Sequence, residues 1–263
     1  MVEPAEPAPS ARPEARGTLG TVRNAVALLD LLSDGPAYQH LNDLSDRSGL
    51  SVATVHRLLR SLVLADLVEQ DPRSARYGLG SGVTRLSERY LGRLPVLGAL
   101  APYLVRLRET TGHTIQIALL VRGSVVYVDR VDAADSGIYR DAHRVRPALA
   151  TAAGRILAAA AEDSAWSQTL EVAAAELRDL GEKERETWRQ SPYLYVAATP
   201  SDSLALPQPG PAELAVGVTD GTGRVAAALA IAPETDLPDE RAEELARHLI
   251  QAATAAGRTL SHG

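Results

Sequence analysis

Residues 49–79 constrain the fold most, because a tight turn, a capped amphipathic helix and a short hairpin follow one another there. Gly49 permits the turn, and Ser51 is a favourable helix N-cap. The apolar residues that follow recur at the spacing of one helix face: Val55, Leu58, Leu59 and Leu62. Residues 67–70 and 76–79 flank the turn-rich residues 71–75 and predict a small β-hairpin.

Two further helices are expected before this segment. Residues 22–32 carry apolar side chains at helical spacing, and the Ser-Asp-Gly-Pro sequence at 33–36 ends that helix. A shorter helix is expected over residues 38–48, with Leu41 and Leu44 facing inward. Three helices followed by a hairpin describe a winged helix-turn-helix, a module that binds double-stranded DNA.

The outward side of the helix after Ser51 carries arginine and no acid before Asp66. The net charge of the chain is −6 at pH 7, but phosphate binding depends on local positive potential. Arg57 and Arg60 are the principal contacts expected in a major groove, and the hairpin would reach phosphate or the minor groove. The predicted DNA-binding residues are Ser51, Thr54, His56, Arg57, Arg60, Arg73 and Arg76. The alternative is a solvated arginine face without a partner.

Several kinds of site are missing from the sequence. The chain has no Cys, which excludes disulfides, thiolate zinc sites and a cysteine nucleophile and favours a cytoplasmic location. No apolar run approaches the roughly 18 residues of a membrane span. The six histidines form no metal-ligand pair at i, i+4, no Gly-x-Ser-x-Gly motif occurs, and Lys183 lies among glutamates. We therefore expect no catalytic residues, no metal site, no cofactor and no membrane partner.

The length of 263 residues predicts about two domains. Residues 1–17 are rich in Pro, Ala and Glu and are expected to form a disordered tail. The winged helix-turn-helix would occupy residues 18–79, and a linker helix residues 80–95, where Pro95 marks a break. The second domain would occupy residues 96–263.

Strands and helices alternate in this second domain. We expect strands over residues 114–121, 125–131, 193–198, 214–219 and 225–232. Helices are expected over residues 96–111, 151–160 and 239–257, and over residues 165–190 with a break near Gly181. Paired strands with helices between them predict a mixed α/β sandwich, so the fold class of the whole chain is α+β.

A run of small residues opens the helix expected at residue 151: Thr151, Ala152, Ala153 and Gly154. The first amides of a helix have no intrahelical acceptors, so this segment could receive an anionic group of a ligand. It is the predicted wall of a binding pocket. Close packing of the helix on the sheet by small residues is the alternative.

Several stretches of the chain resemble the IclR family of bacterial transcriptional regulators. They are residues 22–32, 49–59 (GLSVATVHRLL), 68–80 (ending YGLG), 112–116, 125–131 and 146–155 (RPALATAAGR). The resemblance implies a winged helix that binds operator DNA, a linker helix, and a GAF-like α/β domain that binds a small effector. It also implies a homodimer, or a tetramer made of two dimers.

The sequence departs from the family pattern at two places. Val52 and Ala53 stand where the family usually has Lys and Ser, so that Thr54, Arg57 and Arg60 must contribute more to DNA contact. The family's Gly-Lys pair appears as Gly154 and Arg155, which keeps the charge but changes its geometry.

By resemblance, the sheet side of the pocket falls on Gly217, Leu229 and Ile231, with Ile138 and Arg146 at its rim. Because the sheet positions are apolar here, we expect an aromatic or acyl effector, with Arg146 or the amides after Thr151 holding any carboxylate. A plain apolar core is the alternative for Leu229 and Ile231. The predicted effector-binding residues are Ile138, Arg146, Thr151, Ala152, Ala153, Gly154, Gly217, Leu229 and Ile231.

These observations favour a DNA-binding regulator that responds to an effector, with repression as the expected direction. One alternative is a small-molecule-binding or enzymatic α/β domain whose N-terminal helices form a dimerisation module. Another is a constitutive architectural DNA binder without a ligand. A lack of salt-dependent DNA binding would favour the ligand-binding or enzymatic domain over the regulator. A filled core in the second domain, without a ligand pocket, would favour the architectural DNA binder.

Overall fold

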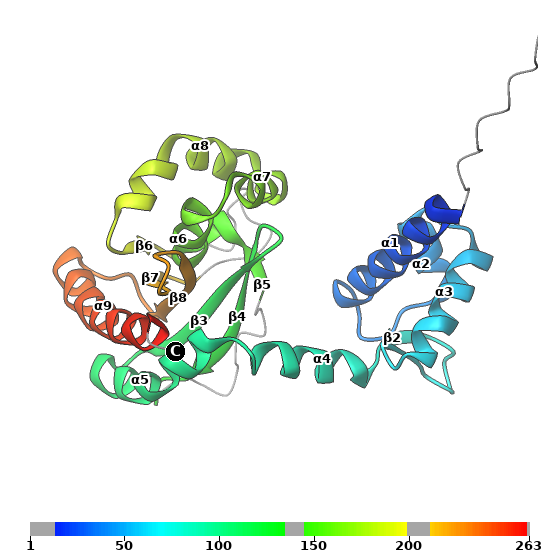
Figure 1. The fold of residues 1–263 in the computed structure, drawn as a ribbon, viewed down its shortest axis with the longest axis horizontal. Helices are drawn as coiled ribbons and strands as arrows, with labels where there is room; N and C mark the ends of the chain where they lie inside the picture. The colour runs from blue at the N-terminus through cyan, green and yellow to red at the C-terminus, as the bar shows by residue number, and fades with distance from the viewer. Residues whose placement is uncertain (1–13, 135–144, 199–210, 262–263) are drawn as a thin grey trace, which may run out of the picture. The chain divides into compact units, whose positions relative to one another are not determined.

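The computed structural model describes residues 14–134, 145–198 and 211–261. It divides the chain into two compact units, Met1–Tyr90 and Leu91–Gly263, each with its own apolar core (Figure 1). The tail predicted over residues 1–17 lies outside the described residues except for residues 14–17, which belong to the first helix. Within these described ranges, no helix combines the length and apolar character needed to cross a bilayer.

The first unit contains three helices and a two-stranded antiparallel hairpin, followed by nearly all of a fourth helix (Figure 1). Its elements are α1 (Glu14–Ser33), α2 (Leu41–Ser48), α3 (Val52–Leu64), β1 (Val68–Gln70) and β2 (Tyr77–Leu79). A fully buried cluster joins the three helices: Leu28, Leu44, Val55 and Leu59. α4 (Ser81–Leu91) follows the hairpin. This is the winged helix-turn-helix that the sequence predicts.

Gly49 and Ser51 make the turn between α2 and α3. Gly49 has φ +69, in the left-handed region, and its amide donates to the Ser45 carbonyl to close α2. Ser51 has an extended backbone, and its Oγ accepts a hydrogen bond from the Thr54 amide at 3.3 Å. The predicted N-cap is confirmed.

Gln39, which the sequence pattern does not single out, holds the hairpin to the helices. Its backbone pairs with that of Tyr77 in both directions, at 2.8 and 2.9 Å. Its side-chain amide donates to the Leu31 carbonyl at 2.9 Å, and its Oε1 accepts from Arg47 at 2.7 Å. Because Gln39 is only 5% exposed and its side-chain polar atoms are paired, it fixes where the hairpin lies on the unit.

The second unit contains a six-stranded sheet in the order β5-β4-β3-β8-β7-β6, with every neighbouring pair antiparallel. The strands are β3 (Thr114–Val121), β4 (Ser124–Val131), β5 (Val145–Pro147), β6 (Leu194–Val196), β7 (Glu213–Thr219) and β8 (Val225–Ala232). A 3-10 turn, η1 (Ala148–Ala150), follows β5.

Helices cover both faces of this sheet (Figure 1). α5 (Pro95–Thr111) and α9 (Asp239–Ser261) pack on one face, over a core that includes Leu229 and Ile231. α6 (Ala152–Ala160) packs on the other, backed by α7 (Asp163–Val172) and α8 (Ala175–Gln190). The result is the α/β architecture expected from the alternation of elements.

The predicted helix break near Gly181 is wrong. The chain breaks between α7 and α8, at residues 173–174, and Gly181 lies buried inside α8. A Cβ at Gly181 would come within 2.9 Å of Leu149 Cδ1 and 3.3 Å of the Trp166 ring. The glycine therefore serves close packing between helices and not a turn.

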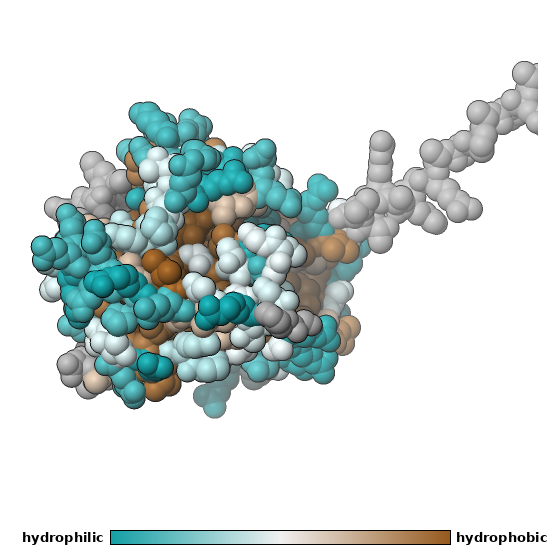
Figure 2. Space-filling view, turned by 60° about the vertical axis from the view of Figure 1, so that its left-hand side comes forward, coloured by the Kyte–Doolittle hydropathy of each residue, from teal (hydrophilic) through white to brown (hydrophobic). Residues whose placement is uncertain are grey.

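Lys183 and its acidic neighbours Glu182 and Glu186 are exposed on α8 of the second unit. Figure 2 shows a face of this unit on which hydrophilic side chains form the margins and apolar side chains are visible in a hollow near the middle.

Candidate functional site

The outward face of α3 presents the side chains that the sequence assigns to DNA contact. His56, Arg57 and Arg60 are exposed, on the side opposite the buried stripe that includes Val55 and Leu59. Ser51 is exposed and Thr54 half-buried, and their hydroxyls lie 2.9 Å apart. These two hydroxyls are engaged in capping the helix, whereas the arginine side chains extend into solvent.

The turn of the hairpin is organised by Asp71. Its carboxylate accepts from the Arg73 amide at 3.1 Å, the Ser74 amide at 3.2 Å and the Ser74 hydroxyl. These hydrogen bonds, the serine hydroxyl foremost, hold the pKa of Asp71 below its usual value. Arg73 is exposed in this turn, where its side chain can contact a polyanion.

Arg76 reaches from the base of the hairpin to the start of α2. Its Nε donates to Nε2 of His40 at 3.0 Å. His40 occupies the N-cap position of α2 but makes no side-chain cap. The sequence predicts Arg76 as a DNA contact but gives no sign of His40, because the two residues are 36 positions apart.

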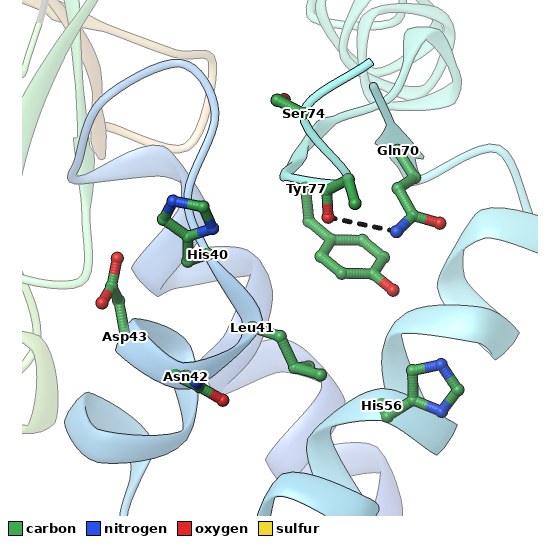
Figure 3. A pocket seen from close by; sticks show the side chains of 9 residues that line it. His40, Leu41, Asn42, Asp43, His56, Gln70, Ser74 and Tyr77 are labelled. Carbon is green, nitrogen blue, oxygen red and sulfur yellow. Dashed lines mark hydrogen bonds between the residues drawn. The ribbon is translucent and has the colours of Figure 1, made fainter. Parts of the chain in front are cut away.

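A groove of about 560 Å³ lies between the start of α2, α3 and the hairpin (Figure 3). Its lining consists of His40, Leu41, Asn42, Asp43, His56, Gln70, Ser74, Ala75 and Tyr77. Figure 3 shows the side chains of Leu41 and Tyr77 pointing into the space between the start of α2, α3 and the hairpin, with His56 on α3. The three elements that a winged helix uses against DNA therefore meet at one concave surface.

In the second unit, the most distinctive group on the α6 face of the sheet is Glu213, at the start of β7. It is 4% exposed, and its Oε1 accepts from the Tyr127 hydroxyl at 2.5 Å. Its Oε2 accepts from the Ala153 amide, in the first turn of α6, at 3.0 Å. Burial raises the pKa of Glu213, although the Tyr127 hydroxyl, the Ala153 amide and the charge of Arg146 act in the opposite direction.

Glu213 was not among the predicted site residues. The expected strand began one residue later, and the partners of Glu213 are 60 and 86 positions away in the sequence. The sequence signal that could have identified Glu213 is the alternation of strand residues, which places residues 213, 215 and 217 on the same face of the sheet. A carboxyl group of the chain itself therefore lies at the start of α6, where the sequence predicts the anionic group of a ligand.

The other predicted residues at this helix start are buried and engaged within the chain. Thr151 caps α6, with its Oγ1 accepting from the Gly154 amide at 2.9 Å. A Cβ at Gly154 would lie 2.0 Å from the Ala148 carbonyl oxygen, so only glycine fits there. At Gly154 the structure bears out close packing, the alternative to a pocket.

Arginine side chains flank this cluster. Arg155 donates from Nε to the Leu149 carbonyl at 2.9 Å and lies over the Trp188 ring, 5.1 Å from its centroid. Burial lowers the pKa of Arg155. Arg146 on β5 is paired in register with Val125, and its charge acts on both Glu213 and Tyr127. The rim residue Ile138 lies outside the described residues.

Gly217 and the pair Leu229 and Ile231 lie on opposite faces of the sheet. Gly217 faces α6, since a Cβ there would meet Ile156 at 3.3 Å. Leu229 and Ile231 are fully buried in the core under α5 and α9. Leu229 and Ile231 therefore do not line a pocket together with the start of α6, and the predicted place of these two residues in the effector site is corrected. The physical reason is the alternation of a strand, in which a shift of one residue moves a side chain to the other face of the sheet.

Two protein-family models match the chain. Residues 21–72 match the IclR helix-turn-helix domain, and residues 88–186 match the bacterial transcriptional regulator IclR C-terminal domain. Together they cover more than half of the sequence. The chain belongs to the IclR family. Members of the IclR family are transcription regulators and not enzymes, in agreement with the expectation from the sequence.

Curated relatives of this IclR-family chain match it over part of their length. The HTH-type transcriptional regulator XynR of Escherichia coli is 29% identical over 140 residues, or 53% of this chain and 56% of XynR. The glycerol operon regulatory protein of Streptomyces coelicolor is 30% identical over 140 residues, 53% of this chain and 55% of that protein. The chain thus aligns with little more than half the length of these relatives.

Solved structures of IclR-family proteins share the fold over nearly the whole chain. A putative IclR transcriptional regulator from Silicibacter is 23% identical, with a TM-score of 0.77 over 92% of this chain and 96% of the other. An IclR homologue from Microbacterium hydrocarbonoxydans, complexed with 4-hydroxybenzoate, is 20% identical, with a TM-score of 0.64 over 92% of this chain and 100% of the other.

Proposed function

We propose that this protein is a DNA-binding transcriptional regulator, with repression as the expected direction, whose operator affinity is controlled by a small effector. The observation that carries the proposal is the exposed arginine face of α3 beside the hairpin in an IclR-family helix-turn-helix. The names of curated relatives, which include regulators and a repressor, support it.

The proposed interface places α3 in the major groove. Arg57 and Arg60 contact base edges or phosphates there, and Arg73 and Arg76 bring the hairpin to the backbone or the minor groove. Ser51 and Thr54 shape the start of α3, and His56 borders the groove beside it. A homodimer, or a dimer of dimers, would present two copies of α3 to two half-sites.

The effector site of the proposal lies on the α6 side of the second unit. Arg146, Thr151, Ala152, Ala153, Gly154 and Gly217 remain its candidate residues, and Ile138 a candidate outside the described ranges. The 4-hydroxybenzoate complex of the Microbacterium homologue supports an aromatic ligand for this class of domain. Ligand binding would shift operator affinity if the two arrangements of the dimer bind the ligand differently.

The test compares Arg57→Ala with Arg23→Ala, which removes an exposed arginine from α1. We expect Arg57→Ala to weaken operator binding by about 1–3 kcal/mol, roughly 5- to 150-fold in Kd, because a base or phosphate contact is lost. Fluorescence anisotropy with promoter DNA from the protein's own gene region, at two salt concentrations and against a scrambled duplex, measures the effect.

Arg23→Ala should leave the Kd within about twofold, since Arg23 is an exposed residue of α1 outside the proposed interface. Equal affinities of the two folded variants would contradict the interface. Weak binding that ignores both sequence and salt, across a wide set of genomic fragments, would favour the alternative of a ligand-binding domain with a dimerisation module.

A further inference from the structure

We propose that the effector of the second unit is an uncharged molecule that brings a hydrogen-bond donor, because the Glu213 carboxyl group occupies the place that a ligand carboxylate would take at the start of α6. This inference rests on the proposed function, since it names the ligand class of the proposed effector site. The sequence predicts an aromatic or acyl effector that can carry a carboxylate. The proposal keeps the apolar body of that effector and excludes the carboxylate.

Four segments of the chain converge on this carboxyl group. β7 provides Glu213, β4 provides the Tyr127 hydroxyl at 2.5 Å, and the first turn of α6 provides the Ala153 amide at 3.0 Å. β5 provides Arg146, whose positive charge lowers the pKa of Glu213. The group is built into the domain, since Tyr127 and Glu213 are 7% and 4% exposed.

The donors that would bind a ligand carboxylate at this helix start are therefore engaged. The Ala153 amide donates to Glu213, and the Gly154 amide donates to Thr151 Oγ1 at 2.9 Å. A ligand carboxylate would have to displace Glu213 from these donors and remain beside it. Two carboxylates in one buried site cannot both stay ionised without a large rise in the pKa of one of them.

The flanking arginines disfavour a cationic ligand in the same way. Arg146 already acts electrostatically on Glu213 and Tyr127, and the charge of Glu213 acts on Arg155, which lies over Trp188. A cationic ligand would be repelled by the positive charges of these two arginines. An uncharged hydroxyl or amide can instead donate to a remaining lone pair of Glu213 or of the Tyr127 oxygen.

Side chains around the carboxyl group suit an apolar ligand body. Four of the sheet positions on the α6 side are alanines, next to the larger Val125 and Tyr127 of β4: Ala118, Ala215, Ala228 and Ala230. Small side chains on a sheet leave the ligand's apolar surface in contact with backbone and methyl groups, while the polar end is held by few groups. A compact aromatic amide or alcohol fits this chemistry.

The experiment measures direct binding of three probes of matched shape and different charge to the full chain: benzoate, benzamide and benzylamine. Isothermal titration calorimetry at pH 7.5 gives each Kd for the wild type, for Glu213→Gln, and for Glu182→Gln as an exposed carboxylate control on α8. We expect the wild type and the control to bind benzamide at least about tenfold tighter than benzoate or benzylamine. Glu213→Gln should gain at least about tenfold in benzoate affinity.

A second arm uses the wild type alone, so that the proposal stays testable if Glu213→Gln does not fold. Because burial raises the pKa of Glu213, lowering the pH from 7.5 moves this group towards its protonated form before benzoate protonates, so benzoate affinity should rise relative to benzamide. The groups that face Glu213 and set this response are Tyr127, Arg146 and Arg155.

Three results would overturn the proposal: no binding of benzamide, benzoate binding to the wild type as tightly as benzamide, or a benzoate affinity that neither Glu213→Gln nor pH changes. Operator binding is measured separately without any probe. A protein that binds its operator but fails these criteria refutes only the ligand class, whereas a protein that does not bind DNA refutes the regulator.

Discussion

The ionisation of Glu213 is linked to the stability of the second unit. Burial raises its pKa above the value of 4.5 that it has when exposed in the unfolded chain. The folded state therefore holds this proton to higher pH than the unfolded state. Its contribution to stability is fully present below pH 4.5 and is lost as the pH rises through the folded pKa.

Replacing Glu213 by Gln removes this dependence, because the amide does not ionise. We expect the free energy of unfolding of Glu213→Gln, minus that of the wild type, to increase as the pH rises from 4.5 to 8, because only the wild type loses stability when Glu213 ionises. Urea unfolding followed by circular dichroism at a series of pH values measures the difference, with Glu182→Gln as the exposed control. A difference between variant and wild type that does not change with pH would show that Glu213 folds with an unshifted pKa.

At the scale of elements, residues 38–40, which lead into α2, connect this helix to the hairpin by hydrogen bonds. Gln39 pairs with Tyr77 through the backbone, and His40 accepts from Arg76 at 3.0 Å. Because His40 Nε2 accepts this hydrogen bond, His40 orients the Arg76 side chain at the base of the hairpin. We therefore expect His40 to act on DNA binding by positioning Arg76.

A double-mutant cycle tests this coupling. We expect His40→Ala to weaken operator binding by about two- to fivefold in the wild-type background, because an unrestrained arginine loses more side-chain entropy on binding. The effect should vanish in an Arg76→Ala background, and His40→Gln, which supplies an acceptor, should restore part of the affinity. Additive losses would show instead that His40 acts independently of Arg76.

The sequence predicts most element boundaries to within a few residues, because apolar periodicity and caps are local signals. The α3 stripe and its Ser51 cap, the hairpin, α5 ending at Gly112 and the β3–β4 pair all follow from such signals. Contacts between distant segments carry no such signal. Glu213 with Ala153, Arg76 with His40, and the face on which Leu229 lies depend on register and packing, so the sequence could not place them.

At the scale of the whole molecule, we propose that the regulator acts as a symmetric dimer that contacts two half-sites. Two copies of α3 related by a two-fold axis enter successive major grooves on one side of the DNA, roughly 34 Å apart. Each half-site alone would be bound by one interface, and the pair gains affinity because the second contact is intramolecular.

Changing the operator tests this arrangement without changing the protein. Insertion of 5 base pairs between the half-sites turns one half-site to the opposite side of the helix, since B-DNA has about 10.5 base pairs per turn. We expect this insertion to weaken binding at least about tenfold, towards the affinity of a single half-site, and an insertion of 10 base pairs to restore part of it. Anisotropy titrations with the three operators, at fixed salt and equal length of DNA, measure the effect. Equal affinity for all three would mean that one copy of α3 accounts for binding, and the dimeric model would then fail.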